Sequence, residues 1–294
     1  MFAAADKKNK LICSIPENKS FIKVLEMPVI SEDEMTEAIK WETEDNIPLP
    51  LEKVYYDWEI IGKDQAGGKM KVLLVASPKE VIESRLEVFN AANLLALGFR
   101  PDSFVLGNLF QGLFRAEVKE EKNIAIIYFG RERSVIFIKN KTTVLFTSSI
   151  LFSVTELFGK LMEAATGSLA AQDKGKIEEI KKGIREAGFL NNQELGKKHR
   201  ELVGDNFEEL AREIQGAITY FEAGAKEKNI EKIYLTGAGA TVAGIKEWIE
   251  ENLGRKIEVG GEFSGFSVDG NSLAMPMNLV CDYSIAIGCA LGSI

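Results

Sequence analysis

The chain has 294 residues, of which 46% are apolar and 27% are charged, as in an ordinary folded protein. That length allows two domains or one large one. The chain has 44 acidic and 36 basic residues, which gives a net charge of −8. No stretch of the sequence concentrates Lys and Arg into a basic patch. Composition and charge therefore exclude a disordered chain and argue against nucleic-acid binding.

Membrane insertion and secretion are not expected either. The longest apolar runs, Ile124 to Phe129 and Ile285 to Leu291, are far shorter than a membrane span. The first ten residues become charged before any apolar run develops, so we expect no secretory signal. The three cysteines have neither disulfide nor metal spacing and are expected to be reduced; they are Cys13, Cys281 and Cys289.

The sequence offers no catalytic motif. The single histidine, His199, lies among Lys197, Lys198 and Arg200, where a solvated loop is expected rather than a catalytic base. There is no Ser-His-Asp arrangement, HExxH, Walker A or CxxC signature. We therefore expect no catalytic residue and no metal ligand among the side chains.

The first part of the chain predicts a small α+β unit. Ser20 to Met27 and Val54 to Ile61 have strand patterns. Between them, Ser31 and Glu34 form a capping box that begins a helix. This helix is expected to end before the Ile-Pro-Leu-Pro stretch that starts at Ile47, because each proline disfavours helical geometry in the residue before it.

The next segment has the pattern of a βα unit. Lys69 to Ala76 is an apolar run that follows a Gly-Gly turn, and we expect it to be buried on both faces, as in a parallel sheet. A helix is expected from Pro78, with a stop at Gly98. A further short helix is expected from about Arg100 through Phe110.

The chain then becomes rich in strands. Three runs joined by short turns predict a meander: Ile124 to Phe129, Ser134 to Lys139 and Thr142 to Ile150. Three helices are expected after it, at Val154 to Ala165, Lys176 to Ala187 and Phe207 to Glu227.

The last part of the chain returns to strand and helix. A strand at Lys232 to Leu235 runs into a Gly-rich loop, which is followed by a helix to Leu253. A short strand at Lys256 to Val259 and a closing helix around Asp282 to Leu291 complete the predicted elements.

Two glycine-containing turns could hold a ligand. Gly130 lies in a strand-turn-strand segment, where backbone N–H groups can point at an anion. Gly237 and Gly239 follow a strand and let the backbone approach a flat ligand, although Val242 stands where a dinucleotide motif has its third glycine. Each feature alone is also explained by a simple turn or by close packing.

A third feature is a charged pair in the helical region. Glu178 and Lys181 are three residues apart on one predicted helix face, where a carboxylate and an ammonium group could hold a hydroxyl-bearing ligand. Such a pair is also common as a solvated salt bridge.

The order of these features, hairpin, helical Glu-x-x-Lys and strand-Gly-x-Gly-helix, is that of the actin-like ATPase superfamily. The stretch Phe21 to Ile61 resembles the inserted subdomain of the type IV pilus assembly protein PilM family. The matching features are a Met-Pro pair, an acidic helix that contains Trp-Glu, and an Ile-Pro-x-Pro stretch before a strand in which an aromatic residue precedes Asp. The similarity covers nearly the whole chain and extends to the related division protein FtsA. It implies an α/β fold, actin-like (ribonuclease H-like) and two-lobed, with an inserted FtsA/PilM-type α+β subdomain.

The resemblance also implies a division of the chain into four parts. They are an inserted α+β subdomain at 10–63, a first lobe at 65–118 with 265–294, a second-lobe core at 122–150 with 230–261, and a helical cap at 151–229. PilM proteins begin with a strand-turn-strand of the GIDIGSS type, and we expect this chain to begin after that phosphate loop, so that the first lobe lacks its N-terminal strands.

The nucleotide site implied by the family is only partly matched. Gly130 and Ser134 match the second phosphate loop, but Tyr128 aligns with the aspartate expected to organise Mg²⁺, and a tyrosine is no substitute for that carboxylate. The resemblance assigns Glu178 and Lys181 to contacts with ribose and adenine. It assigns Gly237 and Gly239 to the adenosine motif, in which Ala238 replaces a usual glycine. The cofactors implied are ATP and Mg²⁺ in a compromised cleft without turnover.

The function implied is that of a scaffold in the inner-membrane assembly platform of a type IV pilus or related secretion system. The expected partners are the N-terminal cytoplasmic peptide of a PilN-like inner-membrane protein and other pilus assembly proteins, and the expected location is cytoplasmic, held at the inner membrane through partners. The alternatives are an active ATPase or sugar-kinase-like phosphotransferase of the same superfamily, and an actin-like filament former.

Overall fold

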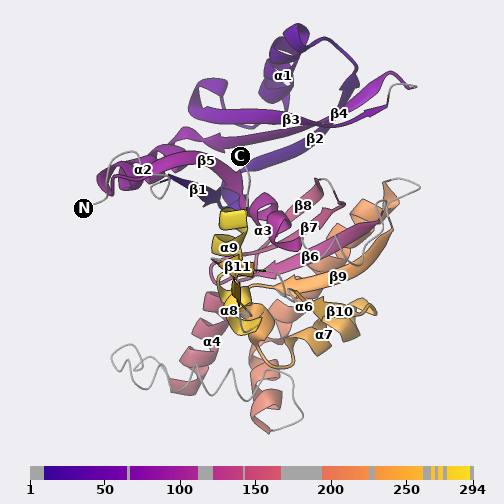
Figure 1. Ribbon diagram of the computed structural model, residues 1–294. Coiled ribbons are helices and arrows are strands. Elements are labelled where there is room, and N and C mark those ends of the chain that lie inside the picture. The colour runs from indigo at the N-terminus through magenta and orange to yellow at the C-terminus, as the bar shows by residue number, and fades with distance from the viewer. Residues whose placement is uncertain are drawn as a thin grey trace. The chain divides into compact units, whose positions relative to one another are not determined.

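The computed structural model describes residues 10–64, 67–111, 122–141, 143–166, 194–224, 229–260, 266–268, 271–273 and 277–291 (Figure 1). The chain divides into two compact units. Unit 1 comprises Met1–Asn108, Thr142–Phe146 and Gly288–Ile294, and unit 2 comprises Leu109–Lys141 and Thr147–Ile287.

Unit 1 contains a three-stranded antiparallel sheet in the order β2-β4-β3, formed by β2 (Phe21–Pro28), β3 (Val54–Asp64) and β4 (Lys69–Pro78). The expectation that the apolar β4 belongs to a parallel sheet is wrong. Only four residues separate β3 from β4, with Gly68 at φ 64°, and a parallel pair needs a much longer crossover. β4 is nonetheless the central strand, which explains its apolar character.

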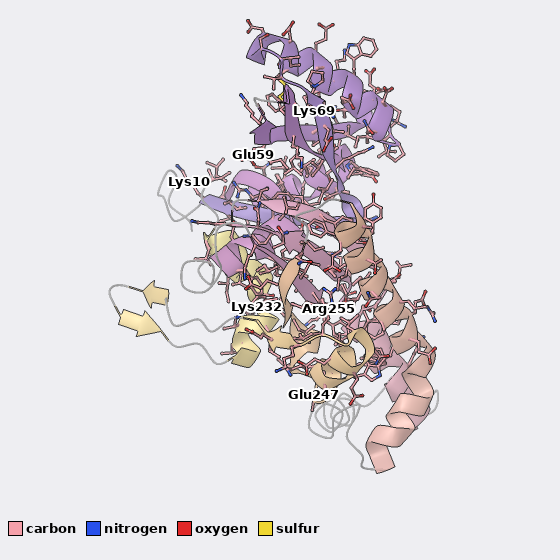
Figure 2. All side chains as sticks on the ribbon, turned by 90° about the vertical axis from the view of Figure 1, so that its right-hand side faces the viewer. Lys10, Glu59, Lys69, Lys232, Glu247 and Arg255 are labelled. Atoms are coloured by element: carbon pink, nitrogen blue, oxygen red, sulfur yellow. The ribbon has the colours of Figure 1, made fainter. Side chains whose placement is uncertain are left out.

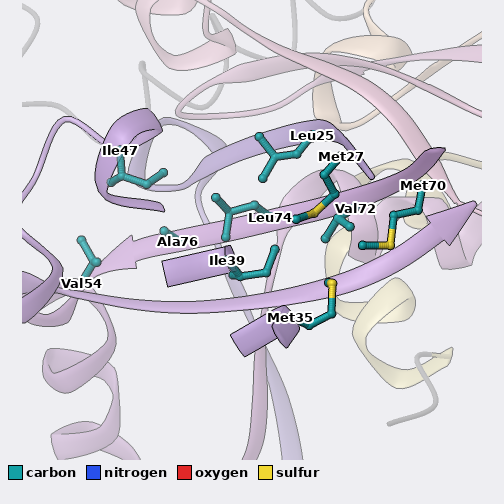
Figure 3. Packing of buried hydrophobic residues seen from close by; sticks show 10 residues of the cluster. All are labelled: Leu25, Met27, Met35, Ile39, Ile47, Val54, Met70, Val72, Leu74 and Ala76. Atoms are coloured by element: carbon teal, nitrogen blue, oxygen red, sulfur yellow. The ribbon is translucent and has the colours of Figure 1, made fainter. Parts of the chain in front are cut away.

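Helix α1 (Glu32–Asn46) covers one face of this sheet (Figure 1). Its capping box is formed as predicted, because the Glu34 carboxylate accepts hydrogen bonds from the Ser31 N–H at 3.0 Å and from the Ser31 hydroxyl at 2.7 Å. The helix ends one residue before Ile47, as the prolines predict. The core between helix and sheet is shown in Figure 3; it comprises Leu25, Met27, Met35, Ile39, Ile47, Val54, Met70, Val72, Leu74 and Ala76.

Unit 1 also holds a parallel strand pair that the sequence pattern did not predict, β1 (Lys10–Ile15) and β5 (Leu95–Pro101). Helix α2 (Lys79–Ala91) ends well before Gly98, the expected stop. Asn93 adopts a left-handed conformation with φ 55° just after the helix and turns the chain into β5. Gly98 therefore lies within a strand.

Helix α3 (Asp102–Gln111) follows β5, close to its predicted position. A carboxylate from a residue far away in the sequence stabilises the first turn of this helix. Glu17 lies in the short 3₁₀ turn η2 (Glu17–Lys19) and is only 5% exposed. Its side chain accepts hydrogen bonds from the Ser103 N–H at 3.2 Å and from the Ser103 hydroxyl at 2.9 Å. The carboxylate thus serves the helix N-terminus, where negative charge is favourable.

Replacing Glu17 with alanine is expected to lower the free energy of unfolding by about 2 kcal/mol, because two buried donors of Ser103 lose their acceptor. Urea unfolding followed by circular dichroism measures the loss. Glu52→Ala is the matched control, since Glu52 is exposed in the 3₁₀ turn η3 (Leu51–Lys53). Equal losses in the two variants would contradict a capping role for Glu17.

Unit 2 is built on a sheet in the order β10-β9-β6-β7-β8. The predicted meander is confirmed, and the central β6 pairs antiparallel with β7 and parallel with β9. The sheet is deeply apolar, since nearly every residue of β6 and β7 is buried. The strands are β6 (Asn123–Phe129), β7 (Ser134–Lys139), β8 (Val144–Ile150), β9 (Ile230–Thr236) and β10 (Ile257–Val259).

Helix α6 (Glu194–Ala223) is longer than predicted and includes His199, so the expectation of a loop there is wrong. Its first part is rich in Lys, Glu and Leu, which favour helix even where the segment is too polar for an apolar stripe to be visible. The helix predicted at Lys176 to Ala187 lies outside the described residues. The remaining helices of the described chain are α4 (Val154–Thr166), α7 (Ile245–Leu253), α8 (Met277–Asp282) and α9 (Ser284–Leu291).

A small antiparallel hairpin, β11 (Phe266–Val268) with β12 (Asn271–Leu273), precedes α8. All three cysteines are free. Within the described ranges, no helix is both long enough and apolar enough to cross a bilayer.

Candidate functional site

The candidate site of unit 2 lies where two neighbouring parallel strands end. Tyr128 of β6 is in register with Thr236 of β9, so the loops that follow these strands emerge side by side. The first loop is the β6–β7 turn that contains Gly130, and the second leads into the 3₁₀ turn η6 (Ala238–Thr241). The carboxyl ends of parallel strands are the usual position for ligands in α/β folds.

The glycines of the second loop are explained by a close approach to Phe129. Gly237 has φ +89°, and a Cβ there would lie 2.5 Å from the Phe129 carbonyl oxygen. A Cβ on Gly239 would lie 2.2 Å from the Phe129 ring. The structure therefore brings both predicted glycines together with the end of β6, and packing alone requires them to be glycine.

Gly130 has a similar role in the first loop. A Cβ at this position would lie 2.3 Å from the Arg133 carbonyl oxygen and 2.5 Å from the Tyr128 ring. The carbonyl of Gly130 accepts a hydrogen bond from the Val154 N–H at the start of α4, at 3.1 Å. This hydrogen bond connects the loop to the helix that follows the meander and stabilises the conformation of the loop.

Ser134, the last predicted residue of the first loop, is completely buried at the start of β7. Its hydroxyl donates a hydrogen bond to the Phe152 carbonyl oxygen at 2.7 Å. The Phe152 ring packs against Phe129 with ring centroids 4.9 Å apart. The hydroxyl therefore stabilises the protein interior in this structure and is turned away from the solvent that a ligand would occupy.

The other two predicted site residues, Glu178 and Lys181, lie outside the described residues. The prediction that this pair binds ribose and adenine therefore stays a prediction.

A hollow of about 150 Å³ opens beside the two loops. It is lined by Tyr128, Arg131, Glu132, Arg133, Ala238 and Asp282. The two arginines are visible in the sequence, since both lie in the predicted turn directly after Gly130. Asp282 could not, because it comes from α8, far along the chain and without a local motif.

The hollow carries both signs of charge. Guanidinium groups from Arg131 and Arg133 suit a phosphate-sized anion, whereas the carboxylates of Glu132 and Asp282 repel one. Glu132 also accepts a hydrogen bond from the Thr155 hydroxyl at 3.2 Å. The volume that these residues enclose is below the about 300–1,000 Å³ of common small-molecule and cofactor pockets.

Mg²⁺ needs several oxygen ligands in a nearly octahedral arrangement. Among the described residues, no group of three or more Asp, Glu, His or Cys side chains is placed to hold a metal ion. Tyr128, expected from the resemblance to stand in place of the family's aspartate, lines the hollow but offers no carboxylate. Tyr128 therefore gives a magnesium ion none of the carboxylate oxygens that an aspartate would supply, whereas Glu132 and Asp282 carry carboxylates at the same hollow.

Cys281 lies close to the second loop but is not poised to react. Its side chain is 1% exposed, and burial raises the pKa of its thiol, with opposing contributions from the Thr236 hydroxyl and the Gly237 backbone. Because the thiolate is the nucleophilic form, this cysteine stays protonated and serves as a packing residue.

The fold of the whole chain is that of a known class. A solved structure described as "PilM-PilN type IV pilus biogenesis complex" is similar at a TM-score of 0.74 and 18% sequence identity, over 97% of this chain and 80% of that chain. A weaker similarity, at a TM-score of 0.46 and 16% identity, is to the ethanolamine utilization protein EutJ from Carboxydothermus hydrogenoformans, over 71% of this chain and 60% of that chain. The first of these two similarities confirms the expected class, an α/β, actin-like fold with an inserted α+β subdomain.

The particular family follows from the sequence itself. The family model of the type IV pilus assembly protein PilM matches residues 3–294, and the chain belongs to this family. The expectation from the inserted-subdomain motif is thereby confirmed, and the family gives the chain a role in type IV pilus assembly.

Proposed function

We propose that this protein is a scaffold of the inner-membrane assembly platform, which binds the N-terminal cytoplasmic peptide of a PilN-like membrane protein. The observation that carries the proposal is the similarity to the PilM-PilN complex, which extends over 97% of this chain. The family match from residue 3 to residue 294 supports the same role.

The three-stranded sheet of unit 1 supports peptide binding by its construction. Both β2 and β3 are edge strands of the three-stranded sheet, and β4 lies between them. An edge strand can pair with an extended peptide through backbone hydrogen bonds, while side-chain pockets select its sequence. Several large apolar side chains at or near these edges are exposed, namely Val29, Tyr55 and Tyr56.

The proposal is tested with a labelled synthetic peptide that reproduces the N-terminal tail of the PilN-like protein from the same genome. Fluorescence anisotropy should show saturable one-to-one binding to the full chain, with a dissociation constant on the order of micromolar. A scrambled peptide of identical composition is the control. A folded protein that binds neither peptide, or both equally, would contradict the proposal.

The nucleotide cleft is proposed to be compromised, and the composition of the hollow supports this. Addition of Mg-ATP at millimolar concentration is expected to leave the unfolding temperature unchanged, because Tyr128 replaces a carboxylate and the Ser134 hydroxyl is already bonded within the protein. A ligand present at 100 times its dissociation constant would add about 2.7 kcal/mol. Differential scanning fluorimetry, with ATP and EDTA as the control, measures the shift; a rise of several degrees that needs Mg²⁺ would contradict this part.

A further inference from the structure

The net charge of the protein is concentrated in one segment. Between Ser20 and Asp64 there are 12 acidic and 4 basic residues, an excess of eight, which equals the net charge of the whole chain. The rest of the chain is therefore balanced. Most of this segment forms α1 and two strands of the three-stranded sheet.

The outward face of α1 combines these charges with an exposed aromatic ring. Trp41 is 62% exposed, an unusual state for the largest apolar side chain. Glu37 precedes it by four residues, and Glu44 and Asp45 follow by three and four, so all three carboxylates lie on the helix face of the indole. The opposite face of α1 carries Met35 and packs on the sheet (Figure 3).

These three carboxylates have no partner within the described part of the chain. Glu37, Glu44 and Asp45 are exposed, and they make neither an ion pair nor a hydrogen bond there. Neighbouring like charges on a helix repel one another. A cation that binds to this face would relieve the repulsion.

Some acidic residues of unit 2 form ion pairs. Glu222 pairs with Arg255 at 2.7 Å, and Glu258 pairs with Lys232 at 3.1 Å (Figure 2 labels the two basic residues). These two carboxylates are neutralised by a neighbouring basic side chain, unlike the three around Trp41.

We propose that the outward face of α1, defined by Glu37, Trp41, Glu44 and Asp45, binds the Lys/Arg-rich segment of the membrane partner. Cytoplasmic segments next to a membrane span are enriched in Lys and Arg. A guanidinium group can stack on the Trp41 indole while neighbouring cations pair with the carboxylates. This inference rests on the proposed function and adds the chemistry of a second contact; an anionic lipid surface would be repelled by the same face.

The test uses the full chain and a labelled synthetic peptide in which arginine alternates with alanine. Binding to the unaltered protein should weaken as salt rises. Trp41→Ala should weaken it roughly fivefold to tenfold, and the combined change Glu37→Gln, Glu44→Gln and Asp45→Asn at least about tenfold. The matched control neutralises three exposed carboxylates of unit 2, Glu209, Glu247 and Glu251, and should change binding less than about twofold.

Three outcomes would overturn the inference. If the control substitutions weakened peptide binding equally, the peptide would be attracted by the net charge of the protein alone. If the unaltered protein bound phosphatidylglycerol vesicles more strongly than the neutralised variant did, the ligand of this face would be a membrane surface. A loss of self-association in the Trp41→Ala variant during sedimentation would mean that a second copy covers the face.

The same variants separate this inference from the proposed function. If the tail of the PilN-like protein binds the unaltered protein and both α1 variants equally, the α1 face is not its docking site and the scaffold proposal stands. If the tail binds none of them, the scaffold proposal itself fails. Circular dichroism checks that each variant is folded, and Trp41 and its neighbours are exposed, so folding should not depend on them.

Discussion

Gly237→Ala should destabilise unit 2 by about 3 kcal/mol or more. The residue adopts φ +89°, which an L side chain tolerates poorly, at about 1–2 kcal/mol. The new Cβ would also lie 2.5 Å from the Phe129 carbonyl oxygen, a backbone atom within the central strand that has little freedom to move. A steric conflict of this kind adds about 1–3 kcal/mol.

Thermal and urea unfolding measure the loss, and Gly254→Ala isolates the conformational part. Gly254 follows α7 with φ +63°, but a Cβ there would meet nothing within 4 Å, so only strain of about 1 kcal/mol is expected. If both variants lose the same stability, the close approach to Phe129 is not what requires Gly237 to be glycine.

Lys139→Met should stabilise the protein by about 3 kcal/mol near neutral pH. Lys139 is 3% exposed at the end of β7, and burial lowers the pKa of its ammonium group from 10.5 to about 8. Its ammonium group donates a hydrogen bond to the Asn140 carbonyl oxygen at 2.7 Å. Each pKa unit corresponds to about 1.4 kcal/mol, so below pH 8 the buried ammonium charge lowers the free energy of unfolding by about 3 kcal/mol.

The pH dependence has a definite sign. Between pH 8 and 10.5 the unfolded state holds more protons at Lys139 than the folded state, so the stability of the unaltered protein rises with pH in that window. The advantage of methionine should therefore be largest below pH 8 and shrink above it. Urea unfolding from pH 6 to pH 10 measures this, with exposed Lys69→Met as the control. A constant difference across the range would contradict the assignment.

The sequence predicted those parts of the fold whose signals are local. The capping box of α1 lies within four residues, and the β6–β7 turn joins two apolar runs directly. The pair β1 and β5 was missed because Lys10 meets Leu95, far along the chain, and no local pattern specifies that partner. Burial on both faces suggests a parallel neighbour for β4, but the short Gly-Gly turn before it permits only an antiparallel one.

The candidate site divides in the same way. Gly237 and Gly239 are visible as a spacing, but their reason, the ring and carbonyl of Phe129, comes from a strand more than a hundred residues earlier. Asp282 joins the hollow only through the fold. The exposed Trp41 was recognised in the sequence as part of a family motif, whereas its exposure among unpaired carboxylates is a property of three dimensions.

The most direct test of the scaffold role is amide hydrogen exchange of the full chain with and without the tail of the PilN-like protein. Binding should slow exchange within Ser20 to Asp64, which contains α1 and the two edge strands, and leave the loops at Gly130 and Gly237 unchanged. Protection confined to those two loops, or no protection at saturating tail, would contradict a peptide-binding scaffold that acts through its inserted subdomain.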